Sequence, residues 1–134
     1  MNGVITMSSD ADSLEQERDH EHTEHKLLMR NLTVSDYPDI KRIMELVYHS
    51  AGGALPESKF RSILKTFPEG QICIEDDGKV IAAAFAVVVD YDKFGDKHTY
   101  MEITGNIYAT THDPRGDVLY GIDVFADPEY RSMR

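Results

Sequence analysis

The sequence has no pair of cysteines, because Cys73 is the only cysteine among its 134 residues. A single cysteine cannot form a disulfide within the chain, and this predicts a protein of a reducing compartment. Cys73 lies in an apolar stretch, where a small buried core residue is the expected role. The fold must therefore depend on its hydrophobic core.

Long apolar runs are also missing from the sequence. The longest, residues 80–89, is too short to span a bilayer. The N-terminal residues do not combine a basic region with an apolar run, as a signal peptide does. These absences predict a soluble cytoplasmic protein without a membrane partner.

Basic residues are scarce, since Lys and Arg number 14 against 24 Asp and Glu, for a formal net charge of -10. Residues 1–24 hold seven acidic residues and one basic residue, Arg18, which leaves -4 for the rest of the chain. This balance argues against nucleic acid or an anionic membrane surface as the main partner.

Residues 1–25 are polar and acidic without apolar periodicity, a composition typical of a disordered segment. His20, His22 and His25 lie there and resemble a metal-binding tract by residue type alone. Such a segment has no scaffold to fix coordination geometry, so no metal site is predicted. The folded domain is predicted to span residues 26–134, the length of one ordinary globular domain.

Two amphipathic helices are predicted after a first strand at residues 26–34. The first helix spans residues 36–49, and the glycine pair that follows ends it. The second begins at Pro56 and closes at residues 68–70. Each has one apolar stripe at helical spacing: Ile40, Ile43, Met44 and Val47 in the first, and Phe60, Ile63, Leu64 and Phe67 in the second.

Three more strands are predicted after the helices. Residues 71–76 and 79–90 flank the turn Asp77-Gly78, a signature of a β-hairpin. The second arm is apolar on both faces, which predicts a central strand covered on both sides. Residues 91–116 are an excursion of mixed character, and residues 117–126 form the last strand. The predicted order is β-α-α-β-β-β.

This order, together with residues 120–131 (YGIDVFADPEYR), resembles the N-terminal part of the GNAT fold of acetyl-CoA-dependent N-acetyltransferases. In that family the fourth strand ends in a valine-x-proline exit, and an arginine or glutamine then begins a Q/R-x-x-G-x-G/A loop. The resemblance implies an α/β (α+β) fold with a mixed, mostly antiparallel sheet, truncated after the fourth strand. The stretch is also similar to the GNAT domain that precedes a carbon-nitrogen hydrolase domain in some bacterial two-domain proteins.

The resemblance implies acetyl-CoA as cosubstrate. The family pairs its fourth strand with the pantetheine arm and binds the pyrophosphate at the following helix N-terminus. Arg134 stands where the first loop glycine belongs, and the sequence stops before the second. The domain is therefore expected to lack its C-terminal part and to be inactive. The implied contacts are Val124, Phe125 and Ala126 with the pantetheine and Arg131, Ser132, Met133 and Arg134 with the pyrophosphate.

Acetyl transfer to an amine requires a base that takes a proton from the attacking ammonium. Glu102 and Asp123 are the candidate carboxylates by this layout, and a hydrogen-bonded or solvent-facing role is the alternative for each. The acceptor is expected to be a small-molecule or peptide amine. Its site is predicted among the aromatic residues of the excursion, which are Tyr91, Phe94, Tyr100 and Tyr108.

Three hypotheses on function stay open at this point. The first is an N-acetyltransferase domain, the second a non-catalytic GNAT-like module that binds a ligand or partner, and the third a structural protein whose resemblance is accidental. A last strand without a neighbour has an exposed backbone edge, and this predicts self-association through that strand.

Overall fold

The computed structural model describes residues 3–6, 25–48 and 52–130. Within them the chain forms one five-stranded sheet in which each strand pairs antiparallel with its neighbour along the chain, in the order β1-β2-β3-β4-β5. The α+β class and the antiparallel pairing are therefore confirmed. The strands are β1 (Gly3–Thr6), β2 (Lys26–Asn31), β3 (Ile72–Asp76), β4 (Lys79–Val89) and β5 (Val118–Ala126).

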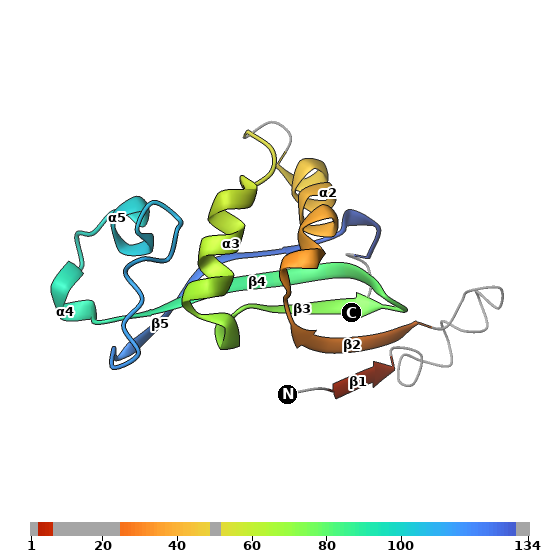
Figure 1. Ribbon diagram of the computed structural model, residues 1–134, viewed down its shortest axis with the longest axis horizontal. Helices are drawn as coiled ribbons and strands as arrows, with labels where there is room; N and C mark the ends of the chain where they lie inside the picture. Colours follow the sequence, from red (N-terminus) through yellow and green to blue (C-terminus); the bar gives the residue numbers. More distant parts are fainter. Residues whose placement is uncertain (1–2, 7–24, 49–51, 131–134) are drawn as a thin grey trace.

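Both predicted helices are present, and they lie on the same face of the sheet (Figure 1). They are α2 (Tyr37–Val47) and α3 (Glu57–Thr66). The first begins later than predicted, because a 3-10 turn (Val34–Asp36) precedes it. The Asp36 carboxylate accepts a hydrogen bond from the Thr33 N–H at 2.8 Å and so caps this turn. The predicted stripes are buried at Ile40, Ile43, Met44, Phe60, Ile63 and Leu64.

Strand β4 runs through the middle of the domain and confirms the predicted hairpin. Asp77 and Gly78 have φ angles of 54° and 90°, as the predicted tight turn requires. The prediction that β4 is covered on both sides was wrong for the described residues. From Ile81 to Val89 the odd-numbered side chains are buried under the helices, whereas the even-numbered ones from Ala82 to Val88 are only half-buried.

The segment predicted to be disordered, residues 1–25, contributes a strand to the sheet. Strand β1 pairs with β2 from Gly3 opposite Met29 to Thr6 opposite Lys26. The sequence analysis missed it because four residues are too few to show a periodicity of two. The remainder of the predicted disordered segment, including His20 and His22, lies outside the described residues.

The excursion between β4 and β5 contains two short helices, α4 (Tyr91–Phe94) and α5 (Tyr100–Thr104). They lie beside α3 at one end of the sheet (Figure 1). Gly105 ends α5 in the left-handed conformation that suits glycine at this position. Of the helices described, none is long and apolar enough to cross a membrane.

Candidate functional site

Strand β5 carries a β-bulge at Ile122. Phe85 of β4 lies opposite Asp123, but the next β4 residue, Ala86, lies opposite Gly121, so Ile122 has no partner on β4. A bulge places two consecutive side chains on nearly the same side of a strand. Ile122 and Asp123 accordingly both line one pocket. The bulge thus directs the carboxylate of Asp123 toward this pocket.

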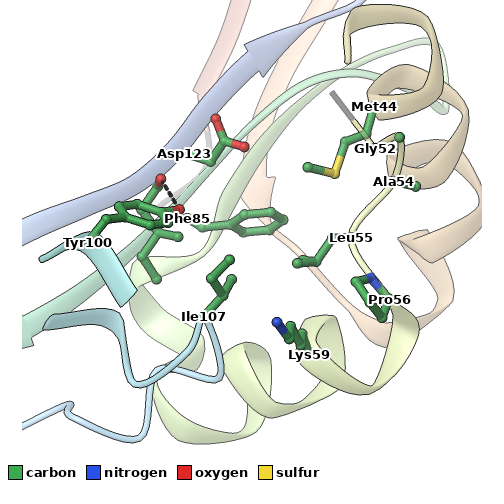
Figure 2. Close-up of a pocket in the computed structure, with 12 residues that line it drawn as sticks. Met44, Gly52, Ala54, Leu55, Pro56, Lys59, Phe85, Tyr100, Ile107 and Asp123 are labelled. Atoms are coloured by element: carbon green, nitrogen blue, oxygen red, sulfur yellow. Dashed lines mark hydrogen bonds between the residues drawn. The ribbon is translucent and has the colours of Figure 1, made fainter. Parts of the chain in front are cut away.

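The pocket lies between the bulge, the end of α2 and the first turn of α3, and its volume is about 240 Å³. Figure 2 shows Phe85, Leu55 and Ile107 at its centre, with Asp123 at one end and Lys59 at the other. Most of its wall is apolar. Ligand pockets usually have volumes of roughly 300 Å³ or more. This pocket is slightly smaller, so it suits a small molecule.

Two tyrosines hold the polar end of the pocket in place. The Tyr48 hydroxyl donates a hydrogen bond to Asp123 Oδ1 at 2.8 Å. The Tyr100 hydroxyl donates to the carbonyl of Ile122, also at 2.8 Å (Figure 2). Burial, the hydrogen bond to Asp123 and its negative charge raise the pKa of Tyr48 to about 12. Burial and the charge of Asp123 also raise the pKa of Tyr100. Both phenols are therefore protonated donors at neutral pH.

Replacing Tyr48 by phenylalanine is expected to change how stability depends on pH between pH 10 and 12. The folded-state pKa of about 12 exceeds the ordinary value of 10.0, so the contribution of the neutral phenol is complete below pH 10 and is lost as pH rises through 12. Urea unfolding at a series of alkaline pH values measures this. As pH rises, the free energy of unfolding of Tyr48→Phe should fall less steeply than that of the wild-type protein. Parallel slopes for the two proteins would contradict the raised pKa of Tyr48.

The two candidate carboxylates have different surroundings. Asp123 lines the pocket, whereas Glu102 is exposed and caps helix α5. Its carboxylate accepts a hydrogen bond from the Thr99 N–H at 2.9 Å, and the Thr99 hydroxyl accepts one from the Glu102 N–H at 3.1 Å. This reciprocal capping box is sufficient to explain Glu102. The structure therefore does not bring the two carboxylates into one site.

Sequence reasoning found only part of the pocket. Of the four aromatic residues predicted to form the acceptor site, Tyr100 lines it. Tyr48 and Lys59 were missed. Tyr48 extends the stripe of α2, because it follows Ile40 and Met44 at steps of four residues, and this signal was available. Lys59 lies next to the core stripe of α3, and no sequence pattern indicates which side of the helix faces a pocket.

Comparison with known proteins identifies two curated relatives, both from Bacillus subtilis (strain 168). Probable hydrolase YhcX is 35% identical over 113 residues, which is 83% of this chain and 21% of that protein. Uncharacterized N-acetyltransferase YkwB is 31% identical over 110 residues, which is 76% of this chain and 49% of that protein. The chain thus spans half or less of the curated relatives it matches. No protein-family model matches it.

Two solved structures have the same fold, each at 19% sequence identity. The loading GNATL domain of CurA from Lyngbya majuscula superposes with a TM-score of 0.65 over 79% of this chain and 50% of that one. The chain has the GNAT fold. A second GNAT-like structure, the GphF decarboxylase in complex with isobutyryl-CoA, gives a TM-score of 0.60 over 78% of this chain and 50% of that one. The GNAT resemblance inferred from the sequence is therefore confirmed.

In this domain with the GNAT fold, the outer edge of β5 carries two of the three predicted pantetheine contacts. Ala86 of β4 turns its N–H and C=O toward the β3 side, where both bind the Gln71 side chain. Asp127, just after β5, turns its N–H toward β4 and donates to the carbonyl of Ile81. Along an antiparallel strand the backbone N–H and C=O groups of successive residues point to opposite sides, so those of Val124 and Ala126 turn away from β4. Within the described residues no strand lies beside that edge.

The other predicted contacts differ. By the same alternation the Phe125 backbone faces β4, and its buried ring packs edge-to-face on Phe85 with the ring centroids 5.7 Å apart. Arg131, Ser132, Met133 and Arg134 lie outside the described residues. The predicted absence of a metal site stays a prediction. In the part of the chain that the structure describes, no three His, Cys, Asp or Glu side chains are grouped to hold a metal ion.

Proposed function

We propose that this domain is an N-acyltransferase that transfers an acyl group, with acetyl as the expected one, from coenzyme A to an amine in the pocket. The observation that carries the proposal is the bulge at Ile122. It places the carboxylate of Asp123 in the pocket, beside the strand edge where Val124 and Ala126 turn their backbone groups outward. A donor paired with that edge would present its thioester to the pocket.

The residues of the pocket suit this reaction. The acceptor enters as an ammonium, and Asp123 takes its proton directly or through one water, while the Tyr48 hydroxyl holds the carboxylate at 2.8 Å. The neutral nitrogen then bonds to the thioester carbon, the carbon–sulfur bond breaks, and the second proton that the nitrogen loses as it becomes an amide is taken up by the sulfur as a thiol. The apolar wall formed by Leu55, Phe85 and Ile107 excludes water that would otherwise hydrolyse the thioester.

Similarity to known proteins supports the proposal at the level of the fold. The GphF structure contains isobutyryl-CoA, so a GNAT-like fold of this kind accommodates an acyl-CoA. The choice of acetyl, the cytoplasmic location, the lack of a nucleic-acid partner, self-association through β5 and the link to a carbon-nitrogen hydrolase domain stay predictions. The expectation that these 134 residues alone are incomplete and inactive also stays a prediction, separate from the reaction proposed for the domain.

Binding of S-acetylpantetheine tests the proposal. This compound carries the thioester and the pantetheine arm but no pyrophosphate, so the result does not depend on residues 131–134. We expect it to shift the NMR signals of β5 and the pocket in a saturable way. A folded protein that shows no shift at millimolar concentration would refute the proposal, and binding without transfer to any amine would favour the non-catalytic module.

Val124→Pro is the matching variant. It removes an outward-facing N–H, and losing one such hydrogen bond should weaken S-acetylpantetheine binding by about tenfold. Leu119→Pro is the control, because Leu119 is also exposed on β5 but lies on the far side of the bulge. Circular dichroism confirms that each variant folds. If both prolines weaken binding equally, the thioester does not lie along residues 124–126.

Acetyl-CoA in the same titration tests the prediction of an incomplete site. If the pyrophosphate donors are missing from this chain, acetyl-CoA should bind no more tightly than S-acetylpantetheine. A gain of about a hundredfold or more, the size that several charge-assisted hydrogen bonds provide, would show that the prediction is wrong while leaving the proposed activity intact.

A further inference from the structure

The pocket has opposite charges at its two ends. Asp123 lies at the bulge, and Lys59 lies on the first turn of α3, with the apolar side chains of Leu55, Phe85 and Ile107 between them (Figure 2). A ligand that fills such a pocket desolvates both charges, and this is costly unless the ligand carries a partner for each. The arrangement therefore carries information about the ligand.

Lys59 is available for an anion. Its side chain is half-buried, and its ammonium lies 5.4 Å from the ring centroid of Tyr108. Within the part of the chain that the structure describes, the ammonium donates no hydrogen bond. The nearest acidic residue along the helix, Glu57, is paired with Arg61 at 3.0 Å. Among the described residues no carboxylate forms an ion pair with Lys59.

Asp123 is suited to the opposite end of the ligand. Its Oδ1 accepts from Tyr48 at 2.8 Å, and a carboxylate has further lone pairs that accept hydrogen bonds. A carboxylate at this end of the pocket is the kind of group that binds an ammonium. An amine placed here would lie beside the bulge and the outer edge of β5.

We infer that the acceptor is an ω-amino acid, an amine whose ammonium lies at Asp123 and whose carboxylate, at the other end of an apolar chain, is bound by Lys59. The inference rests on the proposed function, because it assigns the acceptor to the same pocket. A pocket of about 240 Å³ holds such a molecule whole. It thereby favours a small-molecule acceptor over a peptide.

Three probes that share a chain of six carbon atoms test this assignment in the absence of any acyl donor. They are 6-aminohexanoate, hexylamine and 1,6-diaminohexane, which end in an anion, a methyl group and a cation. Calorimetric titration of the wild-type protein should give the tightest binding for 6-aminohexanoate and the weakest for 1,6-diaminohexane. Adjacent probes should differ by about tenfold in dissociation constant, the size expected for one charge-assisted hydrogen bond.

Variants of Lys59 make the test specific. Lys59→Met should remove the advantage of 6-aminohexanoate over hexylamine, and Lys59→Glu should reverse the order, so that 1,6-diaminohexane binds best. Lys65→Glu is the matched control, since Lys65 lies on the same helix but is exposed and does not line the pocket. That variant should keep the wild-type order.

Several outcomes would overturn the inference. It fails if hexylamine binds the wild-type protein as tightly as 6-aminohexanoate, if Lys59→Glu keeps the wild-type order, or if none of the three amines binds. These results leave the proposed function standing, because S-acetylpantetheine binding tests it separately. If 6-aminohexanoate binds as expected but S-acetylpantetheine does not, the proposed function fails while the pocket keeps its assigned ligand class.

Discussion

Replacing Gln71 by leucine is expected to lower the free energy of unfolding by about 3 kcal/mol. Gln71 is fully buried, and its side-chain amide binds the backbone of β4 as a residue of a neighbouring strand would. Its Oε1 accepts from the Ala86 N–H at 2.9 Å, and its Nε2 donates to the carbonyls of Ala86 and Phe67 at 2.8 Å each. Leucine of similar volume leaves these groups unpaired, and each buried unpaired group costs about 1–3 kcal/mol.

Urea unfolding of the two proteins measures this loss. Asn31→Ala provides the comparison, because Asn31 also donates to backbone carbonyls near Gln71, at 3.1 and 3.2 Å, but is exposed. Water replaces its hydrogen bonds when it is removed, so that variant should lose less than about 1 kcal/mol. Equal losses in both variants would mean that burial at Gln71 does not govern its contribution.

Replacing Arg42 by methionine is expected to cost about 2 kcal/mol at neutral pH. Arg42 lies on α2 and donates to the Asp127 carboxylate at 2.8 Å and to the carbonyl of Val80 at 3.0 Å. The Asp127 side chain is 2% exposed and that of Arg42 34%. Removing one partner of a fully buried pair costs about 3–5 kcal/mol, and the partial exposure of Arg42 reduces that figure.

The dependence of stability on pH distinguishes the Arg42–Asp127 ion pair from a packing contact. Burial alone would raise the pKa of Asp127, but the Arg42 hydrogen bond and the Glu129 N–H outweigh it and hold the pKa below its ordinary value of 3.8. A depressed carboxyl pKa adds stability that is present above pH 3.8 and is lost as pH falls through the folded-state pKa. The deficit of Arg42→Met should therefore shrink at acidic pH.

Urea unfolding at neutral pH and near pH 3 tests both statements. Arg61→Met is the control, since the Arg61–Glu57 pair also joins an arginine to a carboxylate at 3.0 Å, but its side chains are 58% and 49% exposed. An exposed pair of this kind contributes about 0.5 kcal/mol or less. A deficit of Arg42→Met that does not change with pH would indicate that its aliphatic stem matters and its charge does not.

The helices and the hairpin were predictable because their signals are local. Apolar side chains at helical spacing define the buried faces of α2 and α3, and Asp77-Gly78 defines the turn that joins β3 to β4. Coverage of β4 was not predictable in the same way. Its even-numbered residues are alanine and valine, which pack equally well in a core and on a half-exposed face, so composition gave no distinction.

The candidate site was only half predictable for a related reason. Asp123 was identified on β5, but strict alternation along a strand would turn it opposite to Ile122 and Val124. The bulge places Ile122 and Asp123 on the pocket together. Gly121, directly before Ile122, is a sequence signal that was overlooked, because a glycine inside a strand often marks a bulge. Lys59 lines the pocket from α3, and Tyr48 binds Asp123 from the end of α2. Their placement around the pocket therefore depends on tertiary packing alone.

The half-exposed face of β4 also bears on how this protein can change during evolution. Ala83 is 4% exposed in the core, and a larger side chain there would have to displace packed atoms. Ala84 follows it directly but lies on the other face, opposite Val124, whose side chain is 74% exposed. Larger residues fit there without disturbing the core. Ala83 and Ala84 are therefore under unequal constraint. Substitutions along this part of β4 should be tolerated at every second residue.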